Sequence, residues 1–310
     1  MVKRPRIGVI GSNMMDMTSQ IYRMPAMGET IPAAGFDLGY GGKGANQASA
    51  ARKLGADVIM VSKVGSDLFG PGVIENLERQ GINAAHVTVA AGESSGVAPI
   101  FVNERGENGI LVIKGANDHL SCEDIDAAAA DLKACDCLLL QLELAEKTIL
   151  YCLQQADNWG VPLVLNPAPH MPLAYKWLAM ADYLVPNEHE LAQILQQDLP
   201  DRSAVERGAS TLQTHTGNVV IVTAGEQGAY LADGFTAQWI APKKVKAVDT
   251  TGAGDAFIGS FAVFLSESGN VAQSVQKANY YAAMSTLKVG TQKSFLTGEE
   301  WNAVWPGADA

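Results

Sequence analysis

One stretch, Val248-Asp-Thr-Thr-Gly-Ala-Gly-Asp-Ala-Phe-Ile-Gly259, joins a glycine-containing turn directly to an apolar helical pattern that runs to residue 265. A glycine inside a helix costs about 1 kcal/mol relative to alanine, so Gly252 and Gly254 are not explained by helix stability. They suit a backbone that turns sharply and exposes its N–H groups, and a helix N-terminus of this kind binds anions. Asp255 lies inside this anion site and is therefore predicted to act as a base beside a phosphate. An ordinary helix cap is the alternative.

The composition around this stretch is that of a large globular chain. The 310 residues are 47% apolar and 18% charged, which suits one large α/β domain or one domain with an insertion. A net charge of -11 argues against nucleic acid or an anionic membrane as the main partner, but not against a phosphorylated small molecule. No run of 18 apolar residues exists, and the apolar run near the N-terminus is too short for a signal peptide. We therefore expect a cytoplasmic protein that does not span a membrane.

The four cysteines are expected to be buried free thiols. They are Cys122, Cys135, Cys137 and Cys152, and neither a CxxC pair nor a histidine-rich segment accompanies them. Free thiols agree with a reducing cytoplasm.

Strands and helices alternate along most of the chain. The predicted strands are 7–10, 58–64, 137–143, 162–166, 183–186, 219–223, 229–232 and 237–241, and the predicted helices are 45–54, 72–80, 122–133, 146–158, 188–197, 202–215, 253–266 and 271–287. This alternation predicts a three-layer α/β/α core around a mostly parallel sheet. In such sheets the ligand crevice lies at the carboxyl ends of the strands. Polar residues fall at or just past these ends: Asp16, Glu143, Asn166, Asn187 and Thr223.

Two segments interrupt the alternation. Residues 13–40 lack helical periodicity and contain several prolines and glycines, whereas 95–103 and 109–114 have the pattern of a β-hairpin. The hairpin could belong to the edge of the main sheet, or the two segments together could form a small separate sheet. The second arrangement predicts a core of residues 1–12, 41–92 and 115–310, with a β lid made of 13–40 and 93–114.

The segment Gly39-Tyr-Gly41-Gly-Lys-Gly44 matches the GxGxxG pattern, which is weak evidence when it stands alone. A dinucleotide site would need an acidic residue about 20 positions later, where Val64 stands, and a P-loop would need Ser or Thr in place of Gly44. What remains is a flexible loop that presents Lys43 and backbone N–H groups, followed by Asn46 on the first helical turn. Such donors suit a hydroxyl-rich ligand.

Two further patterns follow predicted strands. Asn187-Glu-His-Glu190 places Asn187 and Glu190 on one side of a first helical turn, where they could organise hydrated Mg²⁺ near phosphates or simply cap the helix. Thr223-Ala-Gly-Glu-Gln-Gly228 allows a tight turn at a nucleotide, and an ordinary hairpin turn is the alternative.

Three separated motifs together resemble the ribokinase family of sugar kinases. They are Gly41-Gly-Lys-Gly-Ala-Asn46, Asn187-x-x-Glu190 and Asp249-Thr-Thr-Gly-Ala-Gly-Asp255. The resemblance covers nearly the whole chain, including Asn166-Pro-Ala-Pro169 and the interrupted β lid. It implies transfer of a phosphoryl group from ATP to the primary hydroxyl of a sugar, and a lid that also serves as a homodimer clasp. A catalytically idle sugar-binding protein on the same scaffold is the alternative from a different class.

The resemblance also implies roles for individual residues. Asp255 would be the base, and the backbone N–H groups of Gly252, Ala253 and Gly254 would form the anion hole. The sugar would be held, beside Asp255, by Met14, Asp16, Gly42, Lys43, Asn46 and Glu143. ATP and Mg²⁺ would lie along Asn187, Glu190, Thr223, Gly225, Gly228, Gly254 and Asn279. A monovalent cation, usually K⁺, would be bound, partly through backbone carbonyls, by Asp249, Thr251, Ser285, Lys288, Gly290 and Ser294.

The resemblance breaks at the sugar-binding turn. Ribokinases have Gly-Ser-x-Asn-x-Asp there, whereas this chain has Gly11-Ser-Asn-Met-Met-Asp16, with Met14 in place of Asn. Asn13 cannot take over, because a one-residue shift in an extended segment sends the side chain to the opposite face. A hydroxyl left unpaired against Met14 costs about 1–3 kcal/mol, so a sugar lacking it is favoured. We therefore expect 2-deoxy-D-ribose as the substrate, with D-ribose, fructose-type sugars or nucleosides as alternatives.

Overall fold

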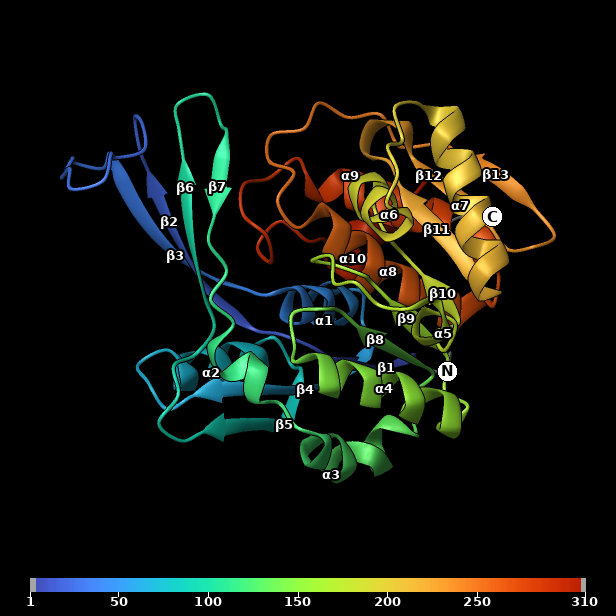
Figure 1. Ribbon diagram of the computed structural model, residues 1–310, viewed down its shortest axis with the longest axis horizontal. Helices are drawn as coiled ribbons and strands as arrows, with labels where there is room; N and C mark the ends of the chain where they lie inside the picture. Colours follow the sequence, from blue (N-terminus) through green and yellow to red (C-terminus); the bar gives the residue numbers. More distant parts are fainter. Residues whose placement is uncertain (1–3, 308–310) are drawn as a thin grey trace.

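The computed structural model describes residues 4–307, and its core is a nine-stranded sheet (Figure 1). In spatial order the strands are β13 (Ala237–Ile240), β12 (Ala229–Ala232), β11 (Val219–Thr223), β10 (Tyr183–Leu184), β9 (Leu163–Leu165), β8 (Cys137–Leu140), β1 (Arg6–Ile10), β4 (Asp57–Gly65) and β5 (Asn83–Ala90). Neighbouring strands from β11 to β5 are parallel, and β12 and β13 add an antiparallel edge. The central strands are apolar and buried, as expected of a sheet covered on both faces.

Helices cover both faces of this sheet, which confirms the predicted three-layer architecture. One face packs against α1 (Lys43–Lys53), α2 (Gly70–Arg79), α8 (Ala253–Ser268) and α9 (Val271–Ser285). The other packs against α3 (Cys122–Leu132), α4 (Glu146–Trp159), α5 (Tyr175–Leu178), α6 (Glu188–Leu195) and α7 (Arg202–Thr216). The last helix, α10 (Gly298–Val304), places Trp301 against Phe264 of α8 and Tyr281 of α9. No helix within residues 4–307 is long and apolar enough to cross a membrane.

A second sheet stands away from the core (Figure 1, left). Its order is β3 (Gly35–Gly41), β2 (Met14–Gln20), β6 (Val97–Val102) and β7 (Asn108–Ile110), so both interrupting segments contribute to one small sheet. We call this sheet the lid. Gly41, which the sequence assigns to the core, is instead the last residue of β3, because its backbone pairs with Met14. Residues 1–3 and 308–310, also assigned to the core, lie outside the described residues.

The sequence prediction lacks β5, α5, α10 and the 3-10 helix at Gly115–His119. The strand β5 lies at the edge of the sheet, and only some of its residues, such as Ala84 and Val87, are buried. Its apolar alternation is therefore incomplete, and the periodicity gave no signal. All four cysteines lie within the described residues and are free thiols, and three of them are buried as expected.

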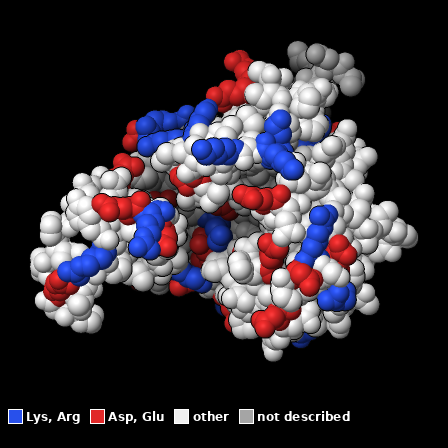
Figure 2. Space-filling model, turned by 90° about the horizontal axis from the view of Figure 1, so that it is seen from above, with Lys and Arg blue, Asp and Glu red and all other residues white. Residues whose placement is uncertain are grey.

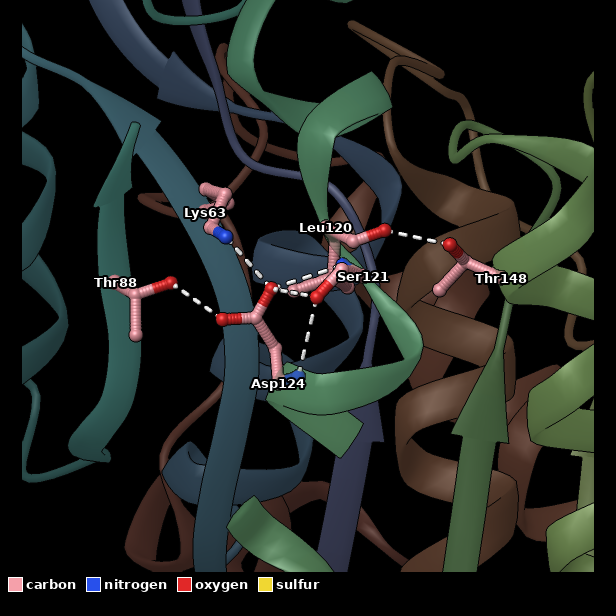
Figure 3. Close-up of polar contacts among 6 residues, drawn as sticks. All are labelled: Lys63, Thr88, Leu120, Ser121, Asp124 and Thr148. Carbon is pink, nitrogen blue, oxygen red and sulfur yellow. Dashed lines mark hydrogen bonds and ion pairs between the residues drawn. The ribbon is translucent and has the colours of Figure 1, made fainter. Parts of the chain in front are cut away.

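A fully paired charged cluster fastens β4, β5 and α3 to one another (Figure 3). Lys63 Nζ lies 2.6 Å from Asp124 Oδ2, and Thr88 Oγ1 donates to the other carboxylate oxygen at 3.1 Å. The same carboxylate accepts from the backbone N–H of Ser121 and so completes the capping box of α3. Burial raises the pKa of Asp124, but the hydrogen bonds from Lys63 and Ser121 outweigh it and hold this pKa below its ordinary value.

Candidate active site

Asp255 stands in the first turn of α8 and is only 7% exposed. Its two carboxylate oxygens accept from two consecutive amides of α1: Asn46 Nδ2 donates to Oδ2 at 3.0 Å, and Gln47 Nε2 donates to Oδ1 at 3.1 Å. Burial raises the pKa of Asp255, and Lys43 together with the two amides opposes that rise. A carboxylate held in place with a raised pKa is suited to accept a proton near neutral pH.

The two glycines before Asp255 differ in what the local structure requires. Gly252 has φ 76°, and a Cβ there would lie 2.2 Å from Thr291 Cγ2, so only glycine fits. Gly254 has no positive φ, and a Cβ there would meet nothing within 4 Å. Because the fold does not require glycine at this exposed position, close approach of a ligand to the backbone explains it better.

The three N–H groups predicted to form the anion hole differ in their hydrogen bonds. The N–H of Ala253 donates to the carbonyl of Thr250 at 3.2 Å, because Gly252 and Ala253 close the turn that starts the helix. The N–H groups of Gly252 and Gly254 have no hydrogen-bond partner within residues 4–307. In this structure the free donors of the turn are therefore those of Gly252 and Gly254, without Ala253.

A second carboxylate, Asp16, faces the same site from the lid strand β2, within the segment 13–40 that the sequence predicted to form the lid. It stands opposite β3, and a Cβ at Gly41 would lie 2.3 Å from both of its oxygens. Burial raises the pKa of Asp16 from 3.8 to about 7, and the nearby negative charges of Glu143 and Asp255 raise it further. The lid therefore carries one wall of a strongly acidic site.

The glycine turn after β3 brings the lid and core together. Gly42 has φ 89°, and a Cβ there would lie 2.7 Å from Asn13 Cα. A Cβ at Gly44 would lie 2.7 Å from the backbone of Gly11 and Ser12, so both glycines permit two chain segments to touch. Glu143 fixes this contact, since it accepts from the Ser12 hydroxyl and from the backbone N–H of Lys43.

Lys43 supplies the positive charge of the site. Burial lowers the pKa of its ammonium group, but the carboxylates of Asp255, Glu143 and Glu190 outweigh this and raise it above its ordinary value. Lys43 thus stays protonated among carboxylates from three different parts of the chain. Figure 2 shows acidic and basic side chains around a hollow between the lid and the core.

Met14 and Asn13 point in opposite directions, as the sequence predicted. Asn13 is fully buried, and its amide donates to Ser62 Oγ at 2.6 Å and to the Lys63 carbonyl at 3.1 Å. Met14 begins β2 two residues before Asp16, so both side chains lie on one face of the strand. The amide of Asn13 is therefore engaged in the core, and Met14 occupies the position that faces the site.

The residues predicted to line a nucleotide lie at the adjacent strand ends. Asn187 and Glu190 form a complete capping box at α6, so the helix-capping alternative is observed, and Asn187 also forms a β-bridge to Thr223, the last residue of β11. Gly225 and Gly228 both have positive φ and enclose a single 3-10 turn. Asn279 Nδ2 donates to the carbonyl of Ile240 at 3.1 Å, at the end of β13. Burial raises the pKa of Glu190, and the backbone N–H of Asn187 opposes the rise.

The residues predicted to bind a monovalent cation lie in two segments joined by Asp249: the loop before α8, and the end of α9 at Ser285 together with the loop that follows it. Its Oδ1 accepts from the N–H of Thr251 and its Oδ2 from that of Gly290, both at 2.9 Å. Burial raises the pKa of Asp249, but these hydrogen bonds outweigh it and keep the pKa below its ordinary value. The hydroxyls of Ser285 and Ser294 donate to backbone carbonyls, and the side chain of Lys288 pairs with Glu300.

Three glutamines that the sequence analysis did not identify also belong to this site: Gln47, Gln141 and Gln292. They are far apart in the chain and belong to no chemical motif, so spacing could not reveal them. The one available signal was the position of Gln47, directly after Asn46 in a helix that also contains four alanines.

Similarity to known proteins agrees with this geometry. The model of the pfkB family carbohydrate kinases matches residues 4–297. The deoxyribokinase of Salmonella typhi is 44% identical over 297 residues, which cover 96% of this chain and 97% of that protein. The ribokinase of Bacillus subtilis is 37% identical over 294 residues, which cover 95% of this chain and 97% of that protein. The solved structure of Arabidopsis thaliana ribokinase complexed with ribose and ATP has a TM-score of 0.87 at 27% identity. The match covers 97% of this chain and 98% of that one.

The fold, the buried carboxylate at a helix N-terminus and these similarities define a sugar kinase. The chain belongs to the pfkB family of carbohydrate kinases, and the relatives named here are ribokinases and a deoxyribokinase.

Proposed function

We propose that this protein transfers the γ-phosphoryl group of ATP to the 5-hydroxyl of a pentose, with 2-deoxy-D-ribose as the preferred acceptor. The observation that carries the proposal is the position of Asp255, which two amides hold beside the free N–H groups of Gly252 and Gly254. A base and an anion site adjacent to each other are what in-line phosphoryl transfer requires.

The reaction follows from these positions. Asp255 accepts the proton of the 5-hydroxyl, the oxygen forms a bond to the γ-phosphorus, and the bond from that phosphorus to the bridging oxygen of ADP breaks. The N–H groups of Gly252 and Gly254 would stabilise the negative charge on the transferring group, and Lys43 would neutralise part of it. Asp255 then carries the proton until it is released with the products.

The acceptor sugar would be held between lid and core. Asp16, Glu143 and Asn46 supply two carboxylates and an amide, and Gly42 and Lys43 border the same space. The carbonyl of Asn46 accepts from Gln292, so its amide offers donors to the ligand. Asp255 itself would contact the hydroxyl that reacts.

Met14 supports the choice of 2-deoxy-D-ribose over D-ribose. Its thioether is buried at the start of β2, on the face that carries Asp16, and cannot pair with a sugar hydroxyl. The similarity to a deoxyribokinase, at 44% identity, is in line with this choice. D-Ribose remains the second candidate, because the ribokinases are also similar along nearly the whole chain.

Steady-state kinetics with 2-deoxy-D-ribose and D-ribose, for the wild type and Met14→Asn, tests this proposal. We expect the ratio of kcat/KM values to favour deoxyribose in the wild type. It should shift toward ribose by about 10-fold or more in the variant, because one hydrogen bond to a sugar hydroxyl is restored. An unchanged ratio would leave the kinase assignment standing but remove Met14 as its specificity determinant. Lack of ATP consumption with any pentose would favour the non-catalytic sugar-binding alternative.

The residues predicted to hold nucleotide fit ATP with hydrated Mg²⁺. Asn187, Glu190, Thr223, Gly225, Gly228 and Asn279 lie at neighbouring strand ends, and Gly254 exposes its N–H beside them. Within residues 4–307 no three His, Cys, Asp or Glu side chains are grouped as metal ligands. Both oxygens of Glu190 accept from Asn187, so Glu190 suits a water of hydration better than the metal itself. When bound, Mg²⁺ would neutralise phosphate charge.

The two segments around Asp249 fit a monovalent cation such as K⁺. The carboxylate is anionic and accepts from the backbone of both segments. Carbonyl or hydroxyl oxygens would come from Thr251, Ser285, Lys288, Gly290 and Ser294. K⁺ would supply positive charge behind the anion site.

The lid is also a candidate dimer clasp. It exposes apolar side chains on one small sheet, among them Phe36, Leu38 and Ile110, which are 61%, 45% and 49% exposed. An exposed apolar sheet of this size suits association with a second copy. We propose a cytoplasmic homodimer joined through the lids. Sedimentation velocity would test whether the protein is a dimer in solution.

A further inference from the structure

A chain of side-chain hydrogen bonds runs from Ser49 on α1, through Gln80 just after α2 and Gln292 in the loop after α9, to Asp255. Ser49 Oγ donates to Gln80 Oε1 at 2.5 Å, and Gln80 Nε2 donates to Gln292 Oε1 at 3.0 Å. Gln292 Nε2 donates to Asn46 Oδ1 at 3.1 Å, and Asn46 Nδ2 donates to Asp255 Oδ2 at 3.0 Å. Every donor in this chain points toward the carboxylate.

A shorter chain reaches the other oxygen of Asp255 from the end of β8. Gln141 Nε2 donates to Gln47 Oε1 at 2.7 Å, and Gln47 Nε2 donates to Asp255 Oδ1 at 3.1 Å. Gln47 and Gln141 are both fully buried, and Gln141 Oε1 has no hydrogen-bond partner within residues 4–307. The amide nitrogen of Gln141 therefore forms the hydrogen bond, and its buried oxygen stays unpaired, which costs free energy of folding.

The common direction of the two chains has a chemical consequence. A primary amide has a donor end and an acceptor end, so its other partners decide which end faces Asp255. These partners are Gln292 at Asn46, and Gln141 at Gln47, where Gln47 Nε2 also donates to Asn166 Oδ1 at 3.4 Å. If either proximal amide rotated by half a turn, its carbonyl would oppose a carboxylate oxygen. Aligned hydrogen bonds also polarise one another and strengthen the last bond of the chain.

We propose that Gln292 and Gln141 are positioning residues that orient Asn46 and Gln47, and thereby keep the buried carboxylate of Asp255 ionised and oriented. This inference rests on the proposed role of Asp255 as the base. It extends that role to residues that do not touch Asp255.

Ionisation of Asp255 needs the support of the two amides because some of the neighbouring charged groups favour the ionised form and others oppose it. Lys43 on α1 favours the carboxylate, whereas Asp16 on β2, Glu143 after β8 and Glu190 on α6 face the same cluster with negative charge. Burial opposes ionisation as well. The amides are neutral donors, so they stabilise the carboxylate without adding a charge that would compete with Lys43.

The test is the pH dependence of kcat, at saturating ATP and 2-deoxy-D-ribose, for the wild type, Gln292→Met and Gln80→Met. Methionine matches the length of glutamine but has no amide. We expect the acidic limb of the profile to move up by about one pH unit in Gln292→Met and by less in Gln80→Met, with kcat recovering at high pH. The KM for ATP should stay unchanged, since the chains do not reach the nucleotide residues.

Gln273→Met, on the exposed surface of α9, is the matched control and should reproduce the wild-type profile. A uniform loss of kcat at all pH values, or an acidic limb that does not move in either variant, would overturn the inference. Gln80 lies on the far side of Gln292, where Asn76 Nδ2 also donates to Gln292 Oε1 at 3.2 Å. The double variant Gln80→Met/Asn76→Leu, which removes both donors, therefore keeps the test decisive if Gln292→Met does not fold. Asp255→Asn, assayed in parallel, distinguishes a failure of this inference from a failure of the proposed function. If Asp255→Asn retains turnover, the assignment of Asp255 as the base fails.

Discussion

Two groups of charged side chains in this protein are built in opposite ways. In the cluster of Lys63 and Asp124, each charge has a direct partner, and the pKa of Asp124 is held below its ordinary value (Figure 3). In the cluster of Asp16, Glu143 and Asp255, three carboxylates share Lys43, and the pKa of Asp16 is raised to about 7. The first arrangement lowers the free energy of the folded state, whereas the second raises it. Charge repulsion of this kind is tolerated where chemistry uses it.

Replacing the lysine of the acidic cluster should give the largest effect. In Lys43→Met, Asp255, Glu143 and Glu190 lose their shared counter-charge, so we expect kcat/KM to fall by about 10²- to 10³-fold. The free energy of unfolding should change by no more than about 1 kcal/mol, because the carboxylates can relieve their repulsion by binding protons. Kinetics and urea denaturation measure the two quantities. If Lys43→Met lost much stability but kept its activity, the acidic cluster would serve stability rather than catalysis, contrary to this prediction.

The matched change in the paired cluster should do the opposite. Lys63→Met leaves Asp124 without its ion pair, and we expect a loss of about 1–3 kcal/mol in the free energy of unfolding. Because the pKa of Asp124 is depressed in the folded state, this contribution is present above the unfolded pKa and disappears as pH falls through the folded pKa. Denaturation from pH 7 down to about pH 2 should therefore show the two proteins converging, while kcat at pH 7 stays at the wild-type level.

A smaller and opposite effect on stability is expected at Asp16. Between about pH 4 and pH 7 the folded protein holds a proton that the unfolded chain has lost, so ionisable Asp16 makes stability fall as pH rises through this range. Asp16→Asn removes that penalty and should be more stable than wild type by about 1–2 kcal/mol above pH 7, with no gain below pH 4. Thermal unfolding across this range measures the difference, and a loss of stability at pH 8 would contradict the raised pKa.

The sequence predicted the architecture of this protein well because its central strands are apolar throughout and alternate with amphipathic helices. It also predicted that Asn13 would turn away from Met14, since that follows from strand geometry alone. It placed Asp16 in the predicted lid segment 13–40, but it could not show that Asp16 approaches Glu143 and Asp255, because that approach depends on how the lid packs on the core. The glutamines around Asp255 were not predictable either. Gln47, Gln141 and Gln292 meet only through the packing of α1 against β8 and the loop after α9.

The most direct test of the account is Asp255→Asn, assayed for both turnover and binding. Asparagine keeps the size of the side chain but cannot accept the hydroxyl proton. Turnover should fall by at least about 10²- to 10⁴-fold, while calorimetry with 2-deoxy-D-ribose and with ATP gives affinities within a few-fold of the wild type. Turnover close to that of the wild type would contradict the assignment of Asp255 as the base. It would also contradict the view that the cluster of Asp16, Glu143 and Asp255 serves catalysis.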